Sequence, residues 1–79
     1  MKGNNPAAWE KFLSVLDDKM QFNLLDRVRK APGYHFESDT LYIEASNPSE
    51  AEFLNKSLQT LTLFAIDACK VKEVKIKLS

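Results

Sequence analysis

The side chains best suited to covalent chemistry in this sequence are its single histidine, His35, and its single cysteine, Cys69. A nucleophile needs a base that accepts its proton, and usually a third group that orients the base. These two residues are far apart in the sequence, and no third group is spaced to join them. The pattern therefore predicts that the chain is not an enzyme.

Metal ions and cofactors are disfavoured by the same kind of counting. One histidine and one cysteine make no spaced set of ligands, and the acid pair Asp17-Asp18 is typical of a solvated helix end. A phosphate-binding loop needs several glycines before a helix, whereas the chain contains only Gly3 and Gly33. We therefore expect no metal site and no cofactor.

Basic residues are the remaining candidates for binding chemistry. Eleven acidic residues balance eleven basic ones, so no overall positive field favours nucleic acid. Lys72, Lys75 and Lys77 nevertheless gather near the end of the chain. Lysines on an edge strand prevent aggregation, but these three beside Tyr42 could also bind single-stranded nucleic acid weakly. The sequence leaves both roles open, together with contact to a protein partner.

Two helices are expected to begin the domain that positions these residues. Asn5 is placed as an N-cap and Pro6 as the first helical residue, and apolar residues at helical spacing extend this helix to about Asp18. A second, shorter helix is expected over residues 21–30, where a proline-glycine pair soon follows.

Three strands and a further helix complete the predicted fold. Residues 34–37 and 41–45 alternate around a polar turn and predict an antiparallel hairpin. Asn47-Pro48 begins a helix expected to reach about Cys69, and residues 74–78 alternate as a third strand. The predicted class is α+β, in the order α-α-β-β-α-β, with a three-stranded sheet and the helices packed on one face.

This order is related to that of a known nucleic-acid-binding fold. Moving the last strand to the front gives β-α-α-β-β-α, the order of a KH domain, so the layout resembles a permuted KH fold. KH domains clamp a nucleic-acid backbone with a GxxG loop. Neither Gly3 nor Gly33 has a glycine three residues away, so ordinary KH-type binding is not expected.

Two apolar residues of the last helix are predicted to face water. If Leu54 marks the centre of the buried stripe, Leu63 lies roughly opposite it and Ile66 lies on its flank. Scattered surface hydrophobic residues are common, but a pair of them also suits contact with a protein partner. Both readings remain open, and Leu63 and Ile66 join Lys72, Lys75 and Lys77 as candidate partner-binding residues.

The chain is short enough to hold one core. Its 79 residues, 44% of them hydrophobic, predict a single domain over residues 6–79, preceded by a disordered or added N-terminal segment over residues 1–5. No segment has the features of a signal peptide or a membrane span, and the lone cysteine allows no internal disulfide. We therefore expect a cytoplasmic protein that does not enter a membrane.

As a whole, the pattern resembles two domains of bacterial replication proteins. The resemblance covers about residues 8–78 and is carried by W-x-x-F-L-x-x-L from Trp9, D-T-L-Y-I-E-A from Asp39, the helix start at Asn47-Pro48 and the closing V-K-I-K-L. The sequence over these residues is similar to the C-terminal domain of the tau subunit of DNA polymerase III and to the N-terminal domain of the initiator DnaA. Both are KH-like folds used for protein contacts, and both lie outside the ATPase modules of their proteins.

Two departures favour the tau-like reading. The initiator domain usually has a tryptophan in its second helix and an aromatic residue soon after the asparagine that follows the second strand. Neither feature occurs in residues 22–28 or 47–50, and the chain ends directly after its last strand. The tau resemblance implies binding to the polymerase catalytic subunit. The alternative implies binding to helicase or regulatory proteins and self-association of the initiator.

Overall fold

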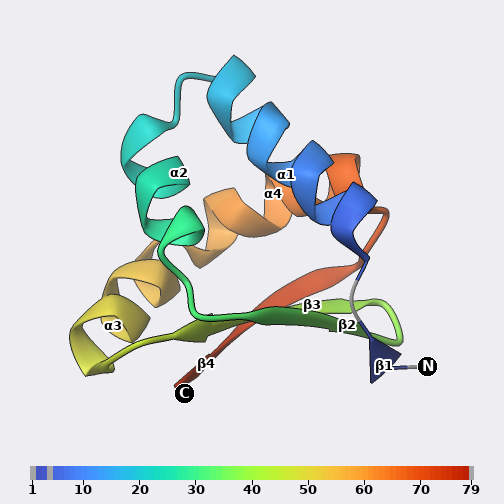
Figure 1. Cartoon of the computed structure of the whole chain (residues 1–79). Helices are drawn as coiled ribbons and strands as arrows, with labels where there is room; N and C mark the ends of the chain where they lie inside the picture. The colour runs from blue at the N-terminus through green and yellow to red at the C-terminus, as the bar shows by residue number, and fades with distance from the viewer. Residues whose placement is uncertain (1, 4, 79) are drawn as a thin grey trace.

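The structure places a layer of helices over one face of a β-sheet (Figure 1). A computed structural model describes residues 2–3 and 5–78. The elements in chain order are β1 (Lys2–Gly3), α1 (Pro6–Asp18), α2 (Phe22–Arg29), β2 (Tyr34–Glu37), β3 (Thr40–Ala45), α3 (Pro48–Lys56), α4 (Leu58–Cys69) and β4 (Glu73–Leu78). The α+β class and the order α-α-β-β-α-β are confirmed, with α3 and α4 together in the place of the third helix.

Asparagine caps fix the starts of two helices. The side chain of Asn5 accepts a hydrogen bond from the backbone N–H of Ala8 at 3.2 Å, and that of Asn47 accepts one from Glu50 at 2.9 Å. In both helices a proline follows the cap, where its missing N–H leaves no hydrogen bond unmade. The predicted starts of α1 and α3 are therefore correct for the expected reason.

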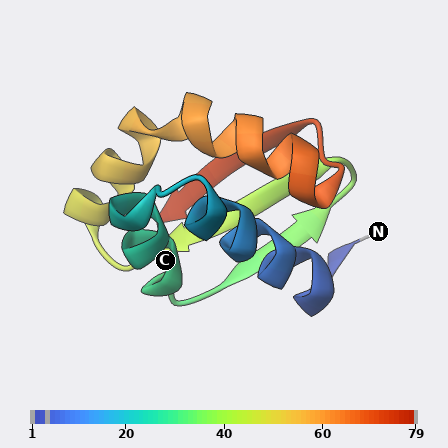
Figure 2. The ribbon, with the colours of Figure 1, turned by 90° about the horizontal axis from the view of Figure 1, so that it is seen from above.

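The sheet combines an antiparallel hairpin with one parallel neighbour. Strands β2 and β3 pair antiparallel, as predicted, while β4 pairs parallel to β3. Parallel neighbours need a crossover connection, which α3 and α4 provide above the sheet (Figure 2). Among the described residues the strand order is β1-β2-β3-β4, so β4 lies at one edge.

The apolar face of the sheet forms the floor of the core. Leu41, Ile43 and Ala45 of β3 are buried under the helices, as predicted. Phe12 of α1 and Leu61 of α4 are fully buried above them. The alternate residues of β2, β3 and β4 point to the opposite face, which none of the helices covers.

The expected single helix over residues 47–69 is wrong, because the chain bends at Ser57. This residue has φ −98° and ψ 9°, and its N–H is shared between the carbonyls of Phe53 and Leu54 at 3.2 and 3.1 Å. The two halves have different packing partners. Helix α3 packs over β3 and β4, whereas α4 packs chiefly against α1. The bend thus follows from tertiary packing, since no proline or glycine marks it in the sequence.

The segment before α1 also differs from the expectation for residues 1–5. Residues 2–3 form the short strand β1, which pairs antiparallel with β2. Asn5 is the N-cap of α1, while residues 1 and 4 lie outside the described part of the chain. The three predicted strands therefore form the main sheet, and β1 extends it at the edge opposite β4.

Candidate interaction surfaces

Leu63 and Ile66 line an open groove on the outer side of α3 and α4. Their side chains are 64% and 45% exposed, which confirms the exposure predicted from the helical spacing. The other lining residues come from the end of α3 and the first half of α4: Asn55, Lys56, Leu58, Gln59, Thr60 and Thr62. The bend at Ser57 lies within this stretch. The shape of the groove therefore depends on a bend that the sequence pattern did not predict.

Several polar groups of the groove already have partners within the domain. Thr62 donates its hydroxyl hydrogen bond to the carbonyl of Leu58 at 2.7 Å, and Asn55 donates to the carbonyl of Ala51 at 3.0 Å. The ammonium of Lys56 lies 3.3 Å from the carboxylate of Glu52. This groove therefore offers apolar contact more than a set of converging polar groups that would hold a small ligand.

The uncovered face of the sheet holds the other candidates. His35 of β2 and Lys75 of β4 lie opposite Tyr42 of β3 in the register, with Lys77 one position further along that face. The imidazole of His35 stacks on the Tyr42 ring at 4.6 Å between centroids, and the Lys77 ammonium lies 5.5 Å from the ring centroid. Strands β2 and β4 flank β3, so His35 and Lys77 approach the ring from opposite sides.

This arrangement weakens the expected role of Tyr42 in binding nucleic acid. A base that stacks on tyrosine needs a free ring face, and both sides of this ring have neighbours. Three carboxylates, those of Glu37, Glu44 and Glu73, share the same sheet face with the lysines. The local charge is therefore mixed, and a strand of phosphates would meet repulsion as well as attraction.

The three candidate lysines do not form one row. Lys75 and Lys77 lie on β4, both exposed and on the same face. Lys72 precedes the strand, and its ammonium lies 3.6 Å from the carboxylate of Asp39 in the β2–β3 turn. Its backbone N–H also donates to the Asp39 carbonyl, at 2.6 Å. Lys72 thus helps to fix the entry to β4, and the prediction that all three act as one patch is not supported by their positions.

The two residues suited to nucleophilic chemistry lie on opposite sides of the sheet. His35 is on the uncovered face, whereas Cys69 is in the helix layer, where its thiol donates to the carbonyl of Ala8 at 3.4 Å. Burial raises the pKa of the Cys69 thiol to about 11, and the positive charge of Lys11 offsets part of that rise. A thiol held protonated is a poor nucleophile. Within residues 2–3 and 5–78, no three His, Cys, Asp or Glu side chains are grouped to hold a metal ion.

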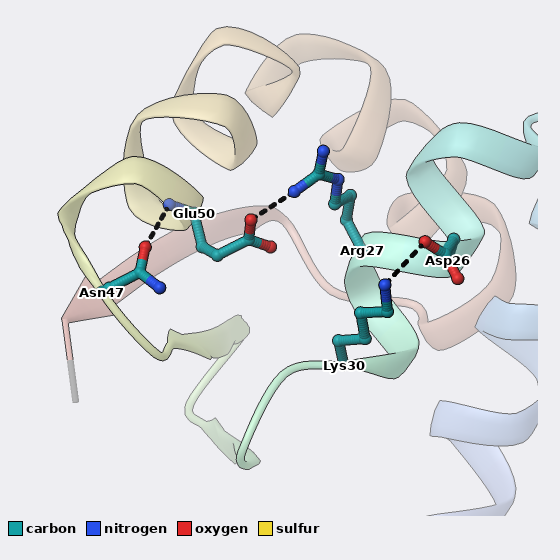
Figure 3. Close-up of polar contacts among 5 residues, drawn as sticks. All are labelled: Asp26, Arg27, Lys30, Asn47 and Glu50. Carbon is teal, nitrogen blue, oxygen red and sulfur yellow. Dashed lines mark hydrogen bonds and ion pairs between the residues drawn. The ribbon is translucent and has the colours of Figure 1, made fainter.

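An ion pair that the sequence analysis missed joins α2 to α3 (Figure 3). The guanidinium of Arg27 contacts the carboxylate of Glu50, whose backbone N–H is held by Asn47. Arg27 also lies over the ring of Phe53, 5.0 Å from its centroid. Lys30, the C-cap of α2, pairs with Asp26 of that helix at 3.2 Å. The partners 27 and 50 are distant in sequence, so only the fold could bring them together.

Two more exposed apolar side chains lie at the corner between α1 and α2. Met20 and Phe22 are largely exposed, and Met20 has a positive φ of 59°. Helical periodicity does not predict their exposure, because each lies at the corner where one helix ends and the next begins. Neither residue lines the α3–α4 groove. Substitutions at Met20 and Phe22 can therefore serve as a control for substitutions in the groove.

Comparison with known proteins identified no relative of the chain. No family model, curated protein or solved structure matches the chain. In the part of the chain that the structure describes, every helix is too short or too polar to cross a bilayer. The resemblance to replication proteins therefore depends on the hydrophobic pattern of the sequence, together with the order of helices and strands.

Proposed function

We propose that the chain is a non-catalytic protein-interaction domain of the bacterial replication machinery that binds the polymerase catalytic subunit in the manner of the tau subunit. The observation that carries the interaction role is the exposure of Leu63 and Ile66 beside one another in the α3–α4 groove. The choice of replication partner rests on the sequence resemblance over residues 8–78.

The energetics of the groove suit a protein contact. Full burial of a leucine or isoleucine side chain contributes about 1.5–3 kcal/mol, which is the size of an interface hot spot. A standard interface covers about 800 Å² of each partner. That is roughly a sixth of the 4946 Å² that this domain exposes, so the groove would form the centre of a wider contact.

The absence of an enzymatic role is also part of this proposal. His35 and Cys69 are on opposite sides of the sheet, and the Cys69 thiol stays protonated near neutral pH. No buried side-chain nitrogen or oxygen among the described residues lacks a hydrogen-bond partner. Catalytic pockets usually contain titratable side chains that converge on one point and have perturbed pKa values.

The test is direct binding of the purified domain to the polymerase III catalytic subunit from the same organism. Changing Leu63→Asp together with Ile66→Asp should weaken this binding at least tenfold, because each change buries a charge in the contact. Met20→Asp with Phe22→Asp is the matched control and should leave the affinity within twofold. Circular dichroism melting of both variants checks that the fold is retained.

The remaining outcomes separate the alternatives. Binding to the replicative helicase or to initiator regulators, with self-association of the domain, would indicate the initiator-like role instead. Binding to a single-stranded oligonucleotide that falls steeply with salt would indicate a nucleic-acid role. Unchanged affinity of the Leu63 and Ile66 variant for the catalytic subunit would remove the groove from the proposal.

A further inference from the structure

Strand β4 presents an open edge of the sheet. Its only strand neighbour among the described residues is β3 (Figure 2). The backbone N–H of Glu73 donates toward β3, to the carbonyl of Asp39 at 3.4 Å. Since alternate residues of a strand direct their backbone groups to opposite sides, Val74, Ile76 and Leu78 direct theirs to the open side. An edge of this kind is a template for a further strand.

The side chains along this edge differ between its two faces. Lys75 and Lys77 are exposed on the uncovered face of the sheet. On the helix-covered face Ile76 is half-buried, and Leu78 remains 57% exposed. The carboxylate of Glu73 lies on the lysine face at the start of β4. A strand added along residues 75–78, beyond Glu73, would meet two positive charges on one face and apolar side chains on the other.

We propose that the β4 edge, with Lys75 and Lys77 on one face and Ile76 and Leu78 on the other, binds an extended peptide in which acidic and apolar residues alternate. The peptide adds a fifth strand to the sheet, with its carboxylates beside the lysines and its apolar residues beside Ile76 and Leu78. This surface differs from the α3–α4 groove, so the proposal does not depend on the function proposed above.

Charge complementarity selects an acidic peptide over a second copy of the chain. Two β4 strands would pair antiparallel through their outward-facing residues, and the most extensive such register is centred on Ile76. That register sets Lys75 of each copy opposite Lys77 of the other. Like charges directly opposite one another destabilise a strand pair, whereas carboxylates in the same places would stabilise it.

The probe is a synthetic peptide of eight alternating glutamate and valine residues, capped at both ends. Binding should slow amide hydrogen exchange at Ile76 and Leu78 by about tenfold or more, because these amides gain hydrogen-bond acceptors. The amides of Lys75 and Lys77 already face β3 and should change little. This alternation within one strand is the specific signature of strand addition.

Three comparisons test the chemistry of the contact. Changing Lys75→Gln with Lys77→Gln should weaken peptide binding about fivefold. Changing Lys11→Gln on α1 with Lys19→Gln at its C-cap removes the same charge elsewhere and should not. A peptide with lysine in place of glutamate should not bind. In an extended peptide the glutamate N–H groups point to one edge and the valine N–H groups to the other, and only one edge faces β4. N-methylation of either the glutamates or the valines should therefore abolish binding, whereas N-methylation of the other residue type should not.

The proposal is overturned if the acidic peptide does not bind, or if both N-methylated peptides bind as well as their parent. It is also overturned if protection at Ile76 and Leu78 rises with protein concentration alone, since a second copy would then occupy the edge. Loss of polymerase binding in the Leu63 and Ile66 variant tests the other surface and leaves this result unaffected.

Discussion

The ion pair between Arg27 and Glu50 should couple α2 to α3 by a measurable amount. The perturbation is a double-mutant cycle built from Arg27→Met, which keeps an aliphatic stem, and Glu50→Gln, which keeps the shape of the side chain. Each change removes one charge and leaves the other partner in place, and the double change removes both. The cycle isolates the interaction between the two side chains from their other contacts.

The expected size follows from the exposure of the pair. Two charges about 4 Å apart near a protein surface attract by roughly 4 kcal/mol before other costs. The side chains of Arg27 and Glu50 are 43% and 21% exposed, so solvent screening, desolvation and lost side-chain entropy offset most of this. A coupling energy of about 0.5–1 kcal/mol should remain. Arg27→Met also loses the contact with Phe53, worth about 0.5–1 kcal/mol more.

Thermal and urea unfolding followed by circular dichroism provide the assay. Each kcal/mol should lower the Tm of a domain this size by about 4–8 °C. In 1 M NaCl the Debye length falls to about 3 Å, and the coupling should fall by at least half. The exposed pair Glu52 and Lys56 on α3 is the control, with an expected coupling of about 0.3–0.5 kcal/mol. Coupling indistinguishable from zero, or unchanged by salt, would refute this account of the α2–α3 contact.

Three further experiments test the helix cap, the core and the thiol. Asn47→Ala should destabilise the domain by about 1 kcal/mol, seen in urea unfolding, because the Glu50 N–H loses its acceptor. Leu61→Ala should cost about 2–5 kcal/mol, but Leu63→Ala, two residues along the same helix, should change stability by no more than about 0.5 kcal/mol; equal effects would contradict the assigned burial. With a pKa near 11 in place of 9.0, Cys69 should react with iodoacetamide at pH 8 about a hundredfold more slowly than in the urea-unfolded chain, and similar rates would argue against its burial.

Local signals in the sequence predict much of the fold. The Asn-Pro pairs predict the starts of α1 and α3 because capping and proline geometry act within a few residues. Alternation predicts β2, β3 and β4 and the buried face of β3 for the same reason. The exposure of Leu63 and Ile66 follows from helical periodicity, because the buried residues Leu61, Ala65 and Ala68 of α4 lie on the other side of the same regular helix.

Other features depend on residues that meet only after folding. The bend at Ser57 arises because α3 and α4 pack on different partners, and it sets the stretch that lines the groove. The neighbours of Tyr42 come from strands before and after it, which weakens the nucleic-acid reading of this ring. No pattern within one element could predict either arrangement.

The sequence by itself thus determined the type and order of the main elements and the buried face of β3, because propensity, capping and periodicity act among residues close together in the chain. The tertiary structure alone decided that β4 pairs parallel to β3 and lies at the sheet edge, that β1 joins the opposite edge, and that Arg27 meets Glu50. These arrangements depend on how the helices pack across the sheet, and that packing energy is shared among residues far apart in the chain.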